Sequence, residues 1–140
     1  MGGRTPHHAL SWTGAALVGV ALACGAARQP APASLKGYDV VIPGDDTLSR
    51  ALAAAFGETE LRVRREVKGG GRPAVALIHQ IFREPGADGK PWLLGRLADT
   101  RSSVILAAAT LPLDSLGTSA QARAQALTRA LLTIPSNPVD

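Results

Sequence analysis

The sequence predicts an α+β fold, a two-layer sandwich in which two helices pack on one face of a mostly antiparallel sheet of four to five strands. Two stretches repeat apolar residues at helical spacing behind residues that cap helices. The stretches between them alternate apolar and polar residues, or form short apolar runs between Gly and Pro. Helices and strands that are apolar on one side bury those sides against each other. The expected order is β-α-β-β-β-β-α, in a single domain over residues 38–134.

The first strand and the first helix are expected within residues 38–57. YDVVIP is a short apolar run with β-branched residues that ends at Pro43, which is typical of a buried strand. Asp45 or Asp46 can accept hydrogen bonds from the first amides of the helix, and Gly57 ends it. One apolar helix face contains Leu48, Leu52 and Phe56.

Four strands follow, which we expect to be joined as hairpins. Their expected positions are residues 61–68, 74–84, 92–99 and 103–111. The triple glycine at 69–71 favours a tight connection, and PGADGKP at 85–91 is a turn bounded by prolines. A third hairpin is expected to turn between Asp99 and Ser103.

The last helix is expected to begin near residue 118. Thr118 and Gln121 have the spacing that satisfies two amides at a helix start. The apolar face then contains Ala120, Ala124, Leu127 and Leu131. Pro135 ends the helix, and residues 135–140 are expected to be frayed.

The amino-terminal stretch has the layout of a secretory signal. Arg4 precedes an apolar centre from about residue 10 to residue 23, which ends in small residues. A centre of this length is shorter than the ~20 residues that cross a hydrocarbon core as a helix. The only cysteine, Cys24, follows directly and cannot form an intramolecular disulfide.

The residues Val20-Ala21-Leu22-Ala23-Cys24 resemble the lipobox of bacterial lipoproteins. The resemblance implies a signal peptide over residues 1–23, cleaved between Ala23 and Cys24, and acylation of Cys24. Two or more acyl chains, at ~0.8 kcal/mol per buried methylene, hold a protein stably at a membrane. Gly25 implies an outer membrane, facing the periplasm, if the organism has two membranes. The alternatives are an uncleaved anchor and a chance cysteine in a secreted protein.

A flexible lipidated linker is expected over residues 24–37, which lack aromatic and β-branched residues. The layout of lipobox, linker, strand, helix, β-meander and helix resembles the lipoprotein of lipopolysaccharide assembly. It also resembles lipoproteins of the curli-export and penicillin-binding-protein-activator type. In the latter, a Leu-x-Asp strand end and a returning Ile or Val strand recur. The matching positions here are Leu97, Asp99, Ser102, Ser103 and Ile105, with Ser103 where that pattern prefers Gly.

No residue pattern indicates catalysis, a metal or a cofactor. His79 has no nucleophile elbow beside it, and we interpret it as a structural strand histidine. Helix capping explains the carboxylate pair Asp45–Asp46, and a turn explains glycines 69–71, which lack the Lys-Ser/Thr of a phosphate loop. A formal net charge of +4 is mild, and a secreted location disfavours nucleic acid as a partner.

One charged segment suggests a binding function. Between residues 62 and 72 the cations are Arg62, Arg64, Arg65, Lys68 and Arg72, against the single acid Glu66. Three of them, Arg62, Arg64 and Lys68, are expected on one strand face. This face is either a solvated or charge-protected edge, or a surface for an anionic lipid or an acidic partner.

Two functional hypotheses follow. The first is a non-catalytic membrane-anchored envelope lipoprotein that docks on or assists an outer-membrane assembly or transport component. The second is a small periplasmic module that binds a lipid or another anionic ligand through the basic strand from Arg62 to Lys68.

Overall fold

The computed structural model describes residues 28–68 and 71–133. The predicted signal peptide, the lipobox with Cys24 and the predicted frayed tail therefore lie outside the described residues. Among the residues that the structure describes, no helix has both the length and the apolar character needed to cross a membrane.

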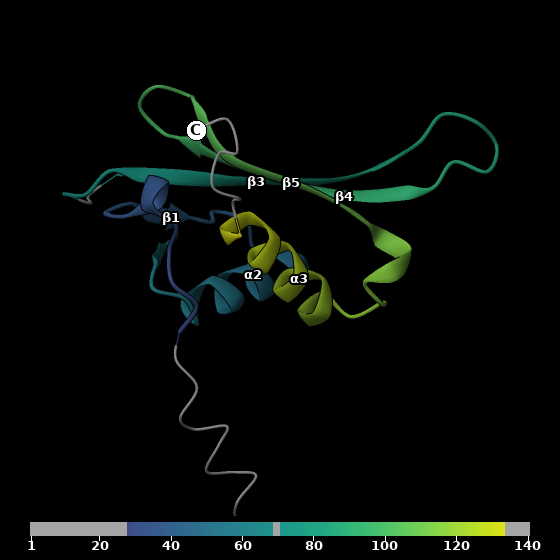
Figure 1. Cartoon of the computed structure of the whole chain (residues 1–140), viewed down its shortest axis with the longest axis horizontal. Coiled ribbons are helices and arrows are strands. Elements are labelled where there is room, and N and C mark those ends of the chain that lie inside the picture. The colour runs from purple at the N-terminus through teal and green to yellow at the C-terminus, as the bar shows by residue number, and fades with distance from the viewer. Residues whose placement is uncertain (1–27, 69–70, 134–140) are drawn as a thin grey trace, which may run out of the picture.

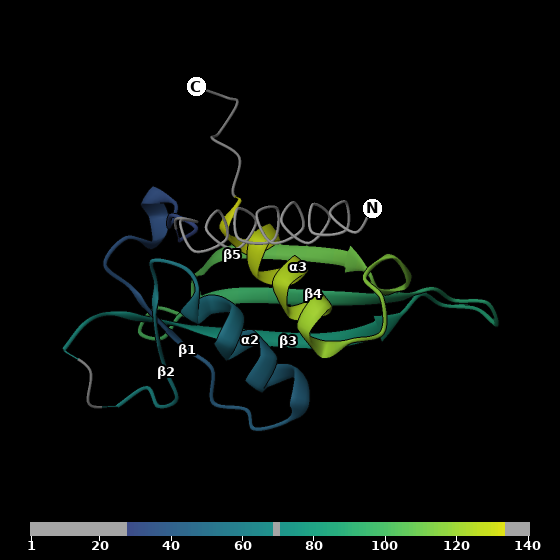
Figure 2. The same ribbon diagram turned by 90° about the horizontal axis from the view of Figure 1, so that it is seen from below.

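A five-stranded open sheet and two helices form two layers (Figure 1). The elements in chain order are η2 (Ala33–Leu35), β1 (Asp39–Val41), α2 (Thr47–Gly57), β2 (Arg62–Arg64), β3 (Ala74–Arg83), β4 (Pro91–Asp99), β5 (Ile105–Pro112), η3 (Leu113–Ser115) and α3 (Ala120–Leu132). Both α-helices lie on the same face of the sheet and run side by side (Figure 2). The predicted α+β class is therefore confirmed.

The sheet is mixed, with strand order β2-β1-β3-β4-β5. The two long pairings, β3 with β4 and β4 with β5, are antiparallel. The short strand β1 is parallel to both of its neighbours, with Val40 opposite Val63 of β2 and Val75 of β3. The hairpin predicted at the triple glycine is therefore wrong, because β1 lies between the two strands that it was to join.

The burial of β1 explains this arrangement. All three of its residues are buried, as is typical of parallel strands, which are usually covered on both faces. Helix α2 connects β1 to β2 and covers the sheet with Leu52 and Phe56, both fully buried. A parallel pair needs such a crossover, and a helix commonly supplies it.

A capping side chain marks the start of each α-helix. The carboxylate of Asp46 accepts a hydrogen bond from the Ser49 amide at 3.2 Å, so Asp46, and not Asp45, caps α2. Ser119 caps α3 by accepting from the Ala122 amide at 3.0 Å. The cap predicted at Thr118 is thus one residue too early.

The folded body begins earlier than residue 38. Leu35 is fully buried in the core, and the chain at Gln29 forms a parallel bridge with Thr59. The Ala31 amide also donates to the Glu60 carboxylate at 3.1 Å. The predicted flexible linker over residues 24–37 is therefore wrong from residue 29 onward, because the apolar side chain of Leu35 fixes this segment to the body.

Gly95 in β4 allows α3 to pack closely on the sheet. A Cβ at this position would lie 2.8 Å from Cδ1 of Leu127, a fully buried core residue of α3. The side chains on either side of Gly95 must point to the opposite face of the sheet. Gly95 therefore identifies which residues of β4 face away from the helices.

The hairpin between β4 and β5 turns where the sequence predicted it. Asp99 Oδ1 accepts from the amides of Arg101 at 2.8 Å and Ser102 at 3.2 Å. Its Oδ2 accepts from the Tyr38 hydroxyl at 2.8 Å. The bonds from Arg101 and Tyr38 hold the pKa of Asp99 below its usual value, and the same carboxylate raises the pKa of Tyr38.

Ser103 closes this turn in a conformation that favours glycine. Its φ is +64°, and it is the only non-glycine residue of the described chain with a positive φ. A left-handed residue with a Cβ is strained by roughly 1–2 kcal/mol.

We expect Ser103→Gly to stabilise the protein by about 0.5–1 kcal/mol, because the relief of strain exceeds the entropy that glycine loses on folding. Ser103→Ala is the matched control, since alanine keeps the Cβ and should leave stability unchanged. Urea unfolding measures both variants. Equal stability of the glycine and alanine variants would contradict the strain at this residue.

Candidate functional site

The sheet face opposite the helices carries three of the six large apolar side chains that are exposed in the described chain: Ile78, Phe82 and Ile105. No helix of the described chain covers this face (Figures 1 and 2). Side chains alternate between the two faces along β4, so the neighbours of Gly95 point to this face, and the residues of β3 and β5 that stand opposite them point the same way. We call this surface the outer face; it comprises Ile78, Gln80, Phe82, Trp92, Leu94, Arg96, Ile105, Ala108 and Thr110.

The outer face is apolar around one cation. Ile78 is 50% exposed and stands opposite Arg96, and Phe82 at 38% exposed stands opposite Trp92. A sheet with one solvated face normally has polar residues on that side. Contiguous exposed apolar side chains instead mark interaction surfaces.

Trp92 and Arg96 differ in whether their polar groups have partners within the chain. The Trp92 indole donates to the Glu84 carboxylate at 2.8 Å, which holds the ring in place. Arg96 is exposed and forms no ion pair with any residue that the structure describes. The guanidinium of Arg96 is therefore available to an acceptor from outside the chain.

Sequence reasoning missed the outer face. Its signal was present in the two long strands, where neighbouring residues on opposite sides are both apolar, as in Leu77-Ile78 and Leu93-Leu94. Such double-sided apolar character predicts that both faces are covered. Helices cover only one face here.

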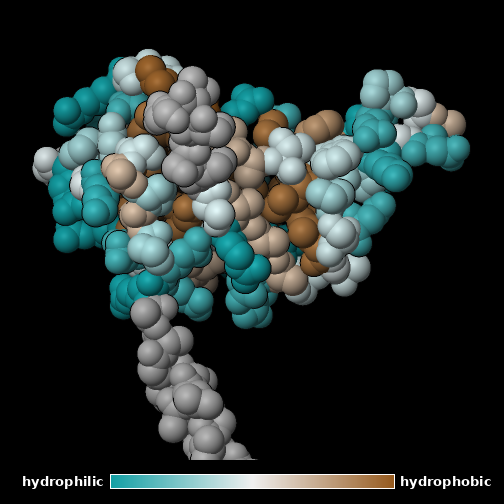
Figure 3. Space-filling view, viewed as in Figure 1, coloured by the Kyte–Doolittle hydropathy of each residue, from teal (hydrophilic) through white to brown (hydrophobic). Residues whose placement is uncertain are grey.

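The hairpin between β3 and β4 projects beyond the helices (Figure 1). Ile81 has the parity of the core residue Leu77, yet it is 50% exposed because no helix reaches it. Figure 3 shows apolar side chains at the base of this projecting hairpin, and mainly hydrophilic residues at its tip.

The predicted anion-binding cluster is largely committed to contacts within the protein. Arg64 Nε lies 3.4 Å from Asp39 Oδ2, and Arg72 Nε lies 3.0 Å from Asp39 Oδ1. The Asp39 side chain is only 3% exposed. Neither nitrogen is aligned for a hydrogen bond, so the attraction is mainly one of charge. A buried carboxylate needs such compensation.

The other cations of the cluster are dispersed. Arg62 lies on the same side of β2 as Arg64, as predicted. Arg65 pairs with Asp45 at 3.2 Å on the surface. Lys68 does not share the strand face, because β2 ends at Arg64. Of these five cations, Arg62 and Lys68 have no carboxylate partner among the described residues.

His79 contributes to a short hydrogen-bonded chain between β3 and α2. The Ser49 hydroxyl donates to Asp46 Oδ1 at 2.5 Å and lies 3.0 Å from His79 Nε2. Because Ser49 gives its proton to Asp46, the histidine nitrogen is the donor in the second bond. The hydroxyl and amide of Ser49 lower the pKa of Asp46.

This order differs from that of a nucleophilic triad. There the histidine accepts the serine proton and the acid orients the histidine. Here the serine stands between the acid and the histidine. The chain Asp46–Ser49–His79 therefore secures the start of α2 against the sheet, which agrees with our interpretation of His79 as structural.

Within residues 28–68 and 71–133, no group of three or more His, Cys, Asp or Glu side chains could hold a metal ion. No family model, curated protein or solved structure matches this chain.

We expect Asp39→Asn to destabilise the protein by about 3 kcal/mol, because it leaves the mostly buried Arg64 guanidinium without its counter-charge. Asp45→Asn is the matched control, since it removes the carboxylate of an exposed pair and should change stability little. Chemical denaturation of both variants gives the comparison. Similar losses in the two variants would show that Asp39 is no more important than a surface acid.

Proposed function

We propose that this protein is a non-catalytic, lipid-anchored protein of a bacterial cell envelope that docks on a membrane-bound protein component through its outer face. The observation that supports docking is the apolar outer face around Arg96, uncovered by any helix of the described chain. The lipobox resemblance at Cys24 supports the anchor.

The occupant that fits the outer face best is a protein surface with apolar side chains and a carboxylate. Aromatic and arginine side chains are the types that contribute most at the centre of protein interfaces. Trp92, Phe82 and Arg96 supply both types on the outer face. An acidic group on the partner would pair with Arg96 while the apolar side chains exclude water around it.

The tether places this partner at the membrane. Cys24 precedes Gln29, the first of the described residues that pairs with the body, by five positions. An extended chain spans at most ~3.6 Å per residue, so this end of the body would stay within roughly 18 Å of the lipidated cysteine. A partner that is itself membrane-bound lies within that range, for instance an outer-membrane assembly or transport component.

The alternative, capture of an anionic lipid by the basic strand, receives less support. Arg64 and Arg72 already face Asp39, and Arg65 faces Asp45. Only Arg62 and Lys68 are left without carboxylates in the described chain, and they do not share a strand. Phosphate recognition works best with several donors converging on one anion.

Site-specific photo-cross-linking in native membranes tests the docking proposal. When the photoreactive residue replaces Gln80 on the outer face, we expect one protein partner to be cross-linked. The cross-linked position in the partner should lie next to an Asp or Glu side chain. A probe at Gln121, on exposed α3, should give no such product. Ile78→Gln and Arg96→Glu should each lower the yield by on the order of tenfold, as expected for interface centres.

Val67→Gln is the matched control, because Val67 is 52% exposed and Ile78 is 50% exposed, and only Ile78 is on the outer face. It should leave the yield unchanged. Equal yields for Ile78→Gln and the wild type would exclude the outer face as the docking surface. Lipid cross-linked in place of protein would favour the binding-module alternative.

Metabolic labelling with a clickable fatty acid tests the anchor separately. We expect the wild-type chain to carry the label and Cys24→Ser to lose it, because the acyl chains are attached through the sulfur of Cys24, which serine lacks. Mass spectrometry of the native protein should then find an amino terminus at Cys24. An intact Met1 with an unmodified thiol would exclude the lipoprotein assignment.

A further inference from the structure

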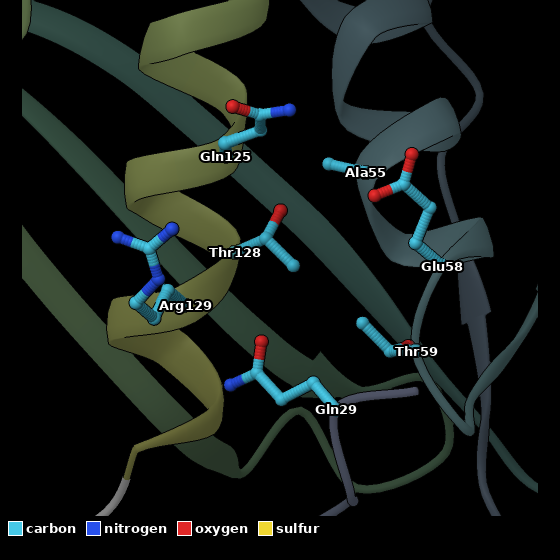
Figure 4. A pocket seen from close by; sticks show the side chains of 7 residues that line it. All are labelled: Gln29, Ala55, Glu58, Thr59, Gln125, Thr128 and Arg129. Atoms are coloured by element: carbon cyan, nitrogen blue, oxygen red, sulfur yellow. The ribbon is translucent and has the colours of Figure 1, made fainter. Parts of the chain in front are cut away.

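A polar pocket of about 290 Å³ lies between α2 and α3. Figure 4 shows Glu58 on the α2 side, Gln125, Thr128 and Arg129 on α3, and Gln29 at one end between the two helices. The helices run in the same direction in Figure 2, so their carboxyl-terminal ends converge here. The pocket is therefore built from three segments that are distant in the sequence.

A buried hydroxyl without a partner lies in the pocket wall. Thr128 is only 3% exposed, and its Oγ1 has no hydrogen-bond partner among the described residues. In Figure 4 its side chain points between the helices, toward the side of Ala55. A hydroxyl in this state is unfavourable in the free protein, and a ligand oxygen or nitrogen would satisfy it.

Two opposite charges flank the same space. Glu58 stands on one side and Arg129 on the other, and neither forms an ion pair within the described chain, with each other or with a third residue. The side-chain amides of Gln29 and Gln125 also point toward this space in Figure 4. The lining of the pocket therefore contains a carboxylate, two amides and a hydroxyl; the guanidinium of the exposed Arg129 lies over α3 in Figure 4, from where this long side chain can turn toward an occupant.

Glu58 directly follows the carboxyl-terminal end of α2, and the negative end of that helix dipole favours a cation at that side. The guanidinium of Arg129 matches a carboxylate or phosphate at the other side. A purely cationic ligand would leave Arg129 unused, and a purely anionic ligand would approach Glu58. The complementary ligand has both charges on one small molecule.

We propose that this pocket binds a compact zwitterion with a primary ammonium group and an oxyanion a few bonds away. The ammonium group would donate to Glu58, the oxyanion would accept from Arg129, and Thr128 would bond to either. The chemistry can come from a soluble molecule or from the ethanolamine phosphate headgroup of a lipid. Only the lipid source depends on the proposed anchor, which would bring Gln29 close to the bilayer.

Calorimetric titration of the full chain in detergent with phosphoethanolamine tests the zwitterion. We expect saturable binding, and affinities lower by about tenfold or more for ethanolamine, inorganic phosphate and phosphocholine. Ethanolamine and phosphate each lack one charge, and phosphocholine has no ammonium hydrogen to donate. Equal affinity for phosphate alone would overturn the zwitterion, and no binding of phosphoethanolamine would overturn the site.

Two variants tie binding to the pocket. Glu58→Gln should weaken phosphoethanolamine binding by about tenfold, while Glu66→Gln, an exposed acid elsewhere, should not change it. Thr128→Val should raise the thermal midpoint of the free protein and also weaken binding, because it removes a hydroxyl that only the ligand satisfies. A Thr128→Val variant with unchanged affinity would overturn the role of the hydroxyl.

Vesicles of two compositions distinguish a soluble zwitterion from a lipid headgroup as the ligand. The full chain is reconstituted in phosphatidylcholine, with or without phosphatidylethanolamine, and titrated with soluble phosphoethanolamine. Weaker apparent binding in the vesicles that contain phosphatidylethanolamine assigns the pocket to a headgroup, and equal binding in both kinds of vesicle assigns it to a soluble zwitterion. Titration in detergent does not require acylation, so failure of the anchor proposal would be seen separately.

Discussion

The burial of β1 between two parallel neighbours is the constraint on which the rest of the structure depends. All three residues of this short strand are buried, and one of them is Asp39. Its carboxylate is compensated from both sides, by Arg64 at the end of β2 and by Arg72 just before β3. The same contacts that hold β1 therefore fix the two segments beside it and occupy much of the basic cluster.

How much the sequence could predict depended on how local each signal was. Helix α2 was predicted from Asp45 or Asp46, Leu48, Leu52, Phe56 and Gly57, which lie within about three helical turns, and the structure confirms it. The β3–β4–β5 meander followed from turns between adjacent strands. The position of β2 did not, because its pairing with β1 passes through a whole helix and leaves no local mark.

The sites show the same limit. A run of arginines predicts positive charge, but not which guanidinium faces a buried carboxylate from a distant strand. Leu35 looked like one apolar residue in a linker, yet it is fully buried in the core, and the pairing of Gln29 with Thr59 brings the body to within five residues of Cys24. The outer face and the pocket between the helices are each assembled from at least three segments. No single stretch of sequence contains either surface.

The two proposed surfaces lie on opposite layers of the molecule. The outer face belongs to the sheet, and the pocket belongs to the helices that cover the other side of that sheet. A partner on the sheet would therefore leave the pocket open. Gln29 adds an asymmetry, because it lines the pocket and is also the residue at which the short tether joins the body. If Cys24 is lipidated, the pocket is held near the bilayer by the same five residues that limit how far the outer face can reach.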